Sequence, residues 1–174
     1  ALESGYYAAF AILGRIAFFA SFSLAFVMFP KVAEAHALGK PNLHLIKKAL
    51  LLVTVVSGGV VLGYLLFPKL VVLVLFGGNY IAITKYITPF AFVMMLFSYV
   101  YVLSYYNLSV NRFSFIYALV ALNILEIIFL FLFHGSFWHV ILVLGILILI
   151  TLIFMLFYTF VKNGKTVNSN SLLQ

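Results

Sequence analysis

The 174-residue sequence lacks cysteine altogether, contains only three acidic residues and is only 7% charged. Without cysteine it can form neither a disulfide framework nor a thiolate metal site. The sequence also shows no paired carboxylates, no nucleophile beside a base and no metal signature. A soluble domain is about one quarter charged. These absences argue against a soluble domain and against an enzyme, and we expect no catalytic residue, metal or cofactor.

The sequence is instead rich in long apolar runs. Hydrophobic residues make up 67% of the chain, and its mean hydropathy is +1.27. The apolar residues form blocks of about twenty, the length of a membrane-spanning helix, and do not alternate with polar residues as the strands of a membrane barrel do. The pattern predicts an all-α integral membrane protein in contact with the lipid bilayer.

The apolar run from Gly5 to Pro30 contains a single charge, Arg15. A helix from Tyr6 to Phe29 would reach roughly 36 Å, enough to cross a hydrocarbon core of about 30 Å. Arg15 would then lie well inside the membrane, where an ionised side chain normally faces protein or a water-filled cavity. Since the run enters the membrane without a basic segment or a cleavage site, we do not expect it to be a signal peptide.

Four further runs give five predicted spans in all. They cover residues 6–29, 49–67, 86–106, 113–133 and 140–161. We expect residues 1–161 to form the membrane domain and residues 162–174 to form a polar, frayed cytoplasmic tail. Between the first two spans, residues 32–38 and 43–50 form either short interfacial helices or a solvated loop. Residues 70–85 suggest an interfacial helix and a turn.

Two features of the spans predict how the helices pack. Gly59 and Gly63 are four residues apart on one face of the second span, a spacing that lets a neighbouring helix approach closely. Tyr99 in the third span either packs between helices or faces a cavity. The fifth span is almost uninterrupted aliphatic and aromatic residues, which suggests a lipid-facing helix.

The basic residues orient the spans. Cytoplasmic loops carry an excess of lysine and arginine, and one of the two orientations concentrates the basic residues on one side. With the N-terminus outside, the outer side receives only Lys69 and Lys85. The cytoplasmic side then receives Lys31, Lys40, Lys47, Lys48, Arg112, Lys162 and Lys165. We therefore expect a cytoplasmic C-terminus, and no nucleic-acid partner, because the charge of +7 is spread over loops.

The candidate site residues are the ionisable groups inside the spans and one neighbouring amide. Arg15 lies nine residues after Tyr6, and Glu126 lies seven before Phe133, which places both about 11–14 Å below the outer ends of their helices. Asn123 lies one turn from Glu126 at a depth of about 15 Å. Two interpretations remain open. Arg15 and Glu126 either line a hydrated cavity, binding an anionic substrate and a coupling proton or cation respectively, or neutralise each other between packed helices.

Several segments resemble a known transporter family. They are SGYYAAFAILGRIAFFASFSLAFVMFPKVAE at residues 4–34, LLFPKLVVLVLFGGNY at residues 65–80 and YYNLSVNR at residues 105–112. The strings GYYAA, LGRI, FPK and FGGNY carry most of the likeness. They are similar to the C-terminal part of polysaccharide and oligosaccharide-lipid flippases of the multidrug/oligosaccharidyl-lipid/polysaccharide exporter superfamily.

The resemblance implies a fold and a function. Such flippases have twelve or more spans in two lobes around a central cavity and work by alternating access. This chain would supply the last five of twelve helices of a multi-pass cell-membrane protein, with the N-terminal lobe and a lipid-linked glycan as its partners. It would be inactive alone. The alternatives are a cation-coupled multidrug exporter of the same superfamily and a membrane-embedded glycan-processing enzyme, although the loops are short and poor in acids.

Overall fold

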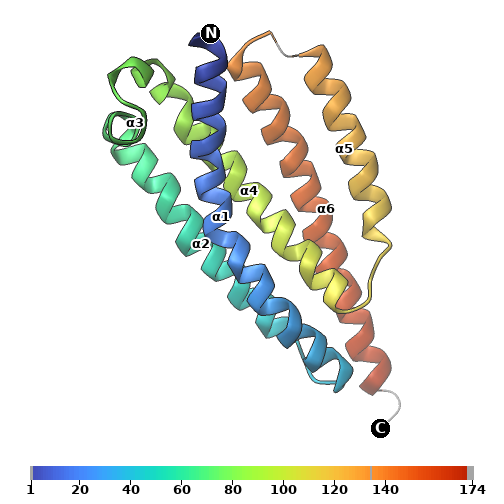
Figure 1. The fold of residues 1–174 in the computed structure, drawn as a ribbon. Helices are drawn as coiled ribbons and strands as arrows, with labels where there is room; N and C mark the ends of the chain where they lie inside the picture. Colours follow the sequence, from blue (N-terminus) through green and yellow to red (C-terminus); the bar gives the residue numbers. More distant parts are fainter. Residues whose placement is uncertain (1, 134, 172–174) are drawn as a thin grey trace.

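The computed structural model describes residues 2–133 and 135–171, and this part of the chain is helical with no strand. Six α-helices and one 3-10 helix follow one another (Figure 1). Their bounds are α1 Leu2–Ala37, α2 Leu43–Leu66, α3 Pro68–Phe76, η1 Gly78–Ile83, α4 Thr84–Ser109, α5 Phe115–Leu132 and α6 Phe137–Ser171.

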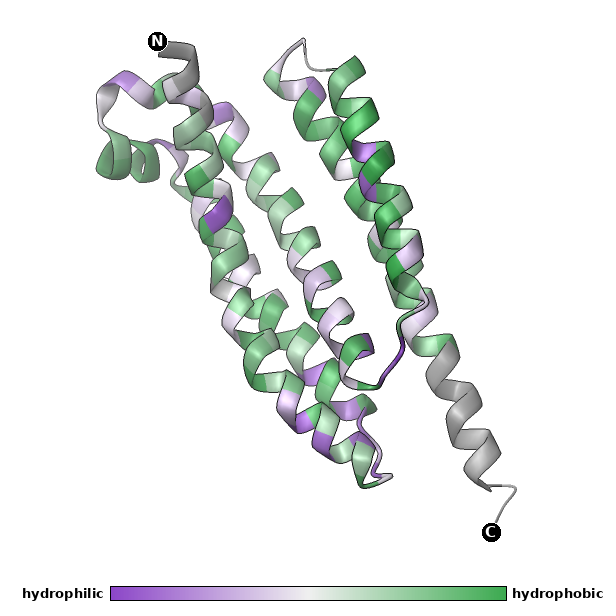
Figure 2. Ribbon diagram, turned by 45° about the vertical axis from the view of Figure 1, so that its right-hand side comes forward, coloured by the Kyte–Doolittle hydropathy of each residue, from purple (hydrophilic) through white to green (hydrophobic). Residues whose placement is uncertain are grey.

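Five segments are long and apolar enough to cross a membrane, and they lie in α1, α2, η1 with α4, α5 and α6. Helix α1 begins at one end of the bundle and α6 ends at the other, as five crossings require (Figure 1). Figure 2 shows hydrophobic helix bodies with most of the hydrophilic residues gathered near the turns. The prediction of an all-α protein with five apolar spans is confirmed, and these helices are those of a membrane protein.

The segment between the first two spans differs from both sequence interpretations. Residues 32–37 continue α1, and residues 43–50 form the first turns of α2. Pro30 lies inside α1, where a missing amide hydrogen costs one backbone hydrogen bond. The break between the helices does fall at Gly39, whose φ of 66° is the left-handed conformation that glycine adopts readily.

The predicted short helix and turn are present as α3 and η1. Pro68 starts α3, a position where its lack of an amide hydrogen costs little. Gly77, with φ 82°, ends α3 and turns the chain into η1. This short excursion brings α4 back beside α1 and α2.

Helix α4 is the centre of the bundle. It packs against α1 and α2 on one side and against α6 on the other, whereas α5 packs mainly on α6. Its side chains Val102, Leu103 and Tyr106 are completely buried. Among the 18 residues of α5, Phe115 alone is buried. The bundle is therefore tight around α4 and open at α5.

Polar side chains join α1 to α2 inside the bundle. The Ser57 hydroxyl donates to the carbonyl of Ala17 at 2.7 Å and lies 2.5 Å from the Ser21 hydroxyl. The Tyr64 hydroxyl donates to the carbonyl of Leu13 at 3.1 Å. Within lipid, where water does not compete, such hydrogen bonds contribute to helix association.

The predicted helix-packing glycines were wrong, because no side chain or neighbouring backbone lies within 4 Å of a Cβ built on Gly59 or Gly63. The close approach occurs at Gly14 of α1, where a Cβ would overlap the ring of Phe90 in α4. The spacing of Gly59 and Gly63 identified a small-residue face on α2, but no helix in the described part of the chain packs closely on that face. The close contact between helices is instead made by α1 and α4, at Gly14.

The last helix also differs from expectation. Helix α6 is not simply lipid-facing, because Leu147, Ile148, Leu152 and Met155 are buried and α6 packs against α4. A uniformly apolar sequence gives no stripe that separates a lipid-facing side from a protein-facing one. The segment predicted as a frayed tail continues α6 to Ser171, and the rest of that tail, residues 172–174, lies outside the described residues.

Candidate functional site

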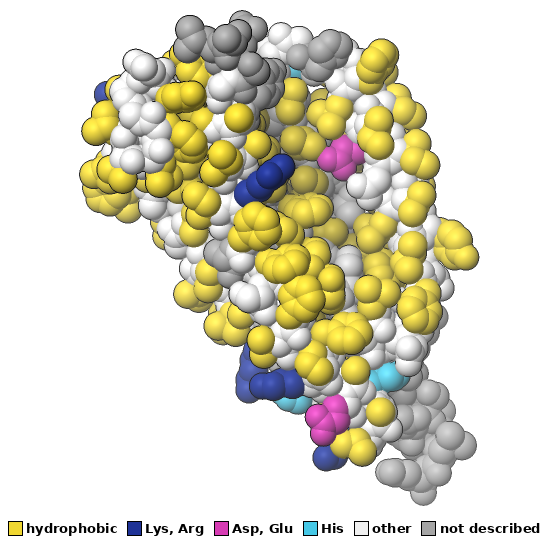
Figure 3. All heavy atoms as spheres, in the orientation of Figure 1, with side chains coloured by type: hydrophobic (Ala, Val, Ile, Leu, Met, Phe, Trp, Pro, Cys, Tyr) yellow, Lys and Arg dark blue, Asp and Glu magenta, His cyan; other side chains and the backbone are white. Residues whose placement is uncertain are grey.

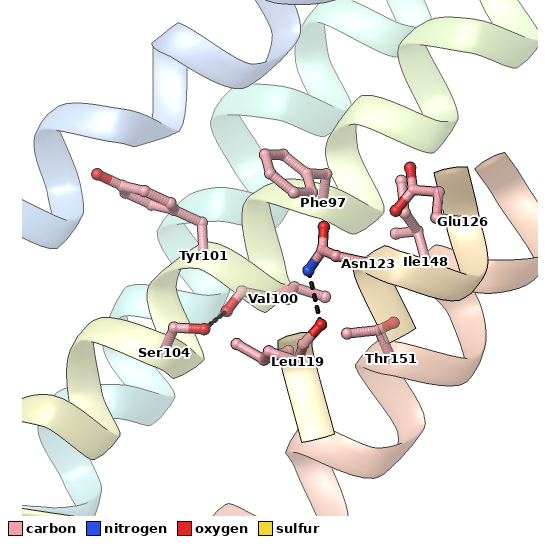
Figure 4. A pocket seen from close by; sticks show the side chains of 9 residues that line it. All are labelled: Phe97, Val100, Tyr101, Ser104, Leu119, Asn123, Glu126, Ile148 and Thr151. Atoms are coloured by element: carbon pink, nitrogen blue, oxygen red, sulfur yellow. Dashed lines mark hydrogen bonds between the residues drawn. The ribbon is translucent and has the colours of Figure 1, made fainter. Parts of the chain in front are cut away.

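A pocket of about 210 Å³ opens between α4, α5 and α6 within their spanning segments. It contains both polar site candidates from α5, Asn123 and Glu126, and Figure 4 shows side chains from three helices around it. The lining residues are Phe97, Val100, Tyr101, Ser104, Leu119, Asn123, Glu126, Ile148 and Thr151.

Asn123 and Glu126 are placed in the pocket by their spacing of three residues, which puts them on one face of α5. The Asn123 amide donates to the carbonyl of Leu119 at 2.8 Å, which holds the side chain against its own helix (Figure 4). Glu126 is half-buried and has neither a hydrogen bond nor an ion pair with any residue that the structure describes. Its carboxyl group is therefore available to a ligand.

Two hydroxyls complete the polar part of the pocket. Ser104 of α4 donates to the carbonyl of Val100 at 2.8 Å, and Thr151 of α6 donates to the carbonyl of Leu147 at 2.7 Å. Both hydroxyl oxygens keep lone pairs that can accept. A carboxyl group, an amide and two hydroxyls supply the oxygen atoms that a proton or a hard monovalent cation requires.

Arg15 lies outside this pocket, and its side chain is exposed on α1. No ion pair joins it to Glu126 or to any other residue in the described part of the chain. Figure 3 shows one basic side chain over the upper part of α1 and one acidic side chain over α5, with hydrophobic side chains between them. The structure thus brings Asn123 and Glu126 together, whereas Arg15 stands apart on α1.

Aromatic rings of α1 and α4 pack against one another next to the pocket. Tyr101, which lines the pocket, stacks on Phe22 with ring centroids 5.3 Å apart and meets Phe18 edge to face at 5.3 Å. The strip continues to Phe26, whose ring centroid is 5.8 Å from that of Tyr105. An aromatic surface therefore adjoins the polar pocket.

Sequence reasoning missed Tyr101, Ser104 and Thr151, since single hydroxyls in an apolar span are common and gave no separate signal. Of the two interpretations of Tyr99, packing holds, because its hydroxyl lies 2.6 Å from that of Thr54 on α2. Counting helix turns places Tyr101 nearly opposite Tyr99 on α4. The cavity-facing tyrosine is Tyr101 instead.

Together these features define a helical membrane protein with a polar pocket and an unpaired arginine within its spans. Comparisons with protein-family models, with curated proteins and with solved structures find no match to this chain.

Proposed function

We propose that the protein exports a lipid-linked oligosaccharide or polysaccharide repeat unit across the cytoplasmic membrane by alternating access. In this proposal the five spans belong to the C-terminal lobe of a flippase-like transporter with at least twelve helices. The lipid-linked glycan passes between this lobe and the N-terminal lobe that the sequence resemblance implies. The observation that carries the proposal is the exposed position of Arg15 within a spanning helix.

The environment that Arg15 requires is the first step of the argument. An arginine deep in the hydrocarbon core costs about 2.5–3.5 kcal/mol on insertion scales, and more in some calculations. Arg15 is exposed on this chain and has no acidic partner among the described residues. The cost falls if water or another protein segment covers the guanidinium group. This supports a hydrated interior beside α1, and not a lipid-facing surface.

The chemistry of arginine then selects the substrate. Its planar guanidinium group binds phosphate through two parallel hydrogen bonds and remains charged at any physiological pH. The diphosphate of a lipid-linked sugar is an anion that crosses the membrane at this depth during flipping. Arg15 is therefore assigned to bind this diphosphate while the glycan passes.

The pocket at Glu126 is the place for energy coupling. An intramembrane carboxyl group is costly unless it is protonated or paired, and Glu126 shares its pocket with the oxygen atoms of Asn123, Ser104 and Thr151. Binding and release of a proton or cation at Glu126 would change the charge of the cavity wall once in each cycle.

The orientation of the spans follows from the positive-inside rule. The turn between α1 and α2 and the turn between α4 and α5 lie at the same end of the bundle as the end of α6 (Figure 1). Lys40 lies in the first turn and Arg112 in the second. We assign this end to the cytoplasm and the beginning of α1 to the outside.

A multidrug exporter of the same superfamily is the second candidate. The observation in its favour is that Glu126 shares the pocket with the rings of Phe97 and Tyr101, since carboxylates and aromatic faces together bind organic cations. In that case Glu126 would contact the substrate and Arg15 would not.

Transport by the full-length protein in proteoliposomes tests the proposal. The assay measures translocation of a fluorescent lipid-linked oligosaccharide, and in parallel the export of a lipophilic organic cation. Arg15→Gln should reduce flipping at least tenfold and Arg15→Lys should retain part of it, because lysine keeps the charge but loses the two-point contact. Lys69→Gln, a matched loss of one exposed charge on α3, should flip normally.

Three results would contradict the proposal. Normal flipping by Arg15→Gln would remove the phosphate-binding role. Recovery of transport when Arg15→Glu is combined with Glu126→Arg would show that the two residues act as a pair. Export of the organic cation that depends on Glu126 but not on Arg15 would favour the multidrug exporter.

A further inference from the structure

A second hollow in the bundle shares no residue with the polar pocket. It is an open groove of about 590 Å³ between α2, α4 and α6. Its lining side chains are apolar apart from the indole N–H of Trp138 and the hydroxyl of Thr88, which already donates to the carbonyl of Tyr64 at 3.0 Å. The lining residues are Val61, Leu65, Thr88, Pro89, Phe92, Val93, Trp138, Ile141, Leu142, Gly145 and Ile146.

The groove begins at one end of the bundle and runs into the membrane. Leu65 is in the last turn of α2 and Trp138 in the first turn of α6. From Trp138 to Ile146 the wall formed by α6 extends about 12 Å, which is most of one leaflet of a hydrocarbon core about 30 Å thick. Because the groove surface is almost entirely apolar, with the indole N–H of Trp138 at its end as the one polar group without a partner among the described residues, a hydrocarbon chain fits it better than water does.

A positive charge stands at the mouth of the groove. The Nζ atom of Lys85 lies 4.8 Å from the ring centroid of Tyr86, and this ring lies 5.4 Å from that of Trp138 in the groove wall. Lys85 is exposed and forms no ion pair with a described residue. Tryptophan, tyrosine and lysine at a helix end are the side chains that meet lipid headgroups.

We propose that this groove binds one acyl chain of an anionic phospholipid from the adjoining leaflet, with the lipid phosphate group held by Lys85. The apolar walls fit the chain, and the ammonium group complements the headgroup charge. One lysine at the membrane surface favours an anionic lipid over a neutral one by about fivefold. The site is independent of the transport function proposed above, because it uses neither Arg15 nor the pocket at Glu126.

Trp138 provides the measurement, since it is the only tryptophan in these 174 residues. The protein is reconstituted at full length, with any tryptophan outside these residues replaced by phenylalanine. The vesicles consist of phosphatidylcholine and a small fraction of a brominated lipid. This lipid is either phosphatidylglycerol or phosphatidylcholine, and in both cases the acyl chain is brominated near its headgroup end. Bromine quenches tryptophan fluorescence on contact. Brominated phosphatidylglycerol should show about five times the relative affinity of brominated phosphatidylcholine.

Three variants locate the effect. Lys85→Gln should abolish the preference for phosphatidylglycerol, whereas Lys69→Gln, which removes an exposed charge from the neighbouring helix α3, should leave it intact. Gly145→Leu fills the groove from α6, where a Cβ would lie 3.3 Å from a methyl group of Val93. It should reduce quenching by both brominated lipids.

The proposal fails if the wild-type protein shows no preference for phosphatidylglycerol or if this preference survives Lys85→Gln. It fails equally if the fluorescence of Gly145→Leu is quenched as strongly as that of the wild type. It also fails if an unlabelled polyprenyl phosphate displaces brominated phosphatidylglycerol more effectively than unlabelled phosphatidylglycerol does. In that case the occupant would be the tail of a lipid-linked glycan.

Discussion

Replacing Gly14 with alanine should destabilise the bundle where α1 crosses α4. The new methyl group would overlap the ring of Phe90 and lie 3.2 Å from Cγ of Met94. The Phe90 ring has no free space to turn into, because the residue is 5% exposed and stacks on Phe10 with centroids 4.0 Å apart. Overpacking a filled core costs about 1–3 kcal/mol, and alanine recovers about 1 kcal/mol of helix propensity.

The matched control is Gly59→Ala, since nothing lies within 4 Å of a Cβ at that position of α2. The helix-propensity gain is common to both variants, so their free energies of unfolding should differ by the overpacking cost alone, about 1–3 kcal/mol. Titration with sodium dodecyl sulfate in mixed micelles, followed by circular dichroism, measures this difference. Adding Phe90→Leu to Gly14→Ala should recover part of the loss. Equal stability of the two alanine variants would refute the assigned contact between α1 and α4.

Three further substitutions test the polar contacts by the same titration. Ser57→Ala removes hydrogen bonds to a carbonyl and to a serine of α1 and should cost about 0.6–1.7 kcal/mol; an unchanged midpoint would contradict this contact. Tyr99→Phe removes the contact with Thr54 and should cost about 0.6 kcal/mol without affecting transport. A transport defect in this variant would indicate that Tyr99 faces a cavity. Asn107→Ala and Thr159→Val each break the same buried hydrogen bond of 2.7 Å, so the double variant should lose less than the sum of the two single losses.

The length and type of the spanning helices could be predicted from the sequence, because twenty apolar residues in a row have few alternatives. Helix ends were less predictable. Polar residues near Lys31 and Lys47 suggested that the helices stop at the membrane surface. A helix can continue beyond that surface into water, however, and both α1 and α2 continue through these lysines. Gly39 and Gly77, each with a positive φ, end their helices by their own conformation.

The arrangement of the helices was hidden from the sequence. Lipid chains are as apolar as leucine, so hydrophobicity does not mark the faces that meet. Gly14 and Gly59 look alike in the sequence, yet only Gly14 lies against a neighbouring helix. For the same reason α5, and not α6, is the most exposed span.

In the sequence, a charged residue inside a span strongly indicated a candidate site, whereas a hydroxyl group inside a span indicated one only weakly. Glu126 and Asn123 were found from their residue types and their spacing on one helix. Thr151 and Tyr101 became visible only when α6 and α4 were placed beside α5, because contacts between helices depend on rotation about each axis.

The weak attachment of α5 has a mechanical consequence. It carries Asn123 and Glu126 but packs mainly on one neighbour, and Phe115 at its beginning is its one buried residue. When such a helix tilts about that end, lipid replaces the few side-chain contacts that it leaves, so little free energy opposes the motion. Because α5 forms one wall of the pocket and bears its carboxyl group, a tilt of this helix would change the width of the pocket.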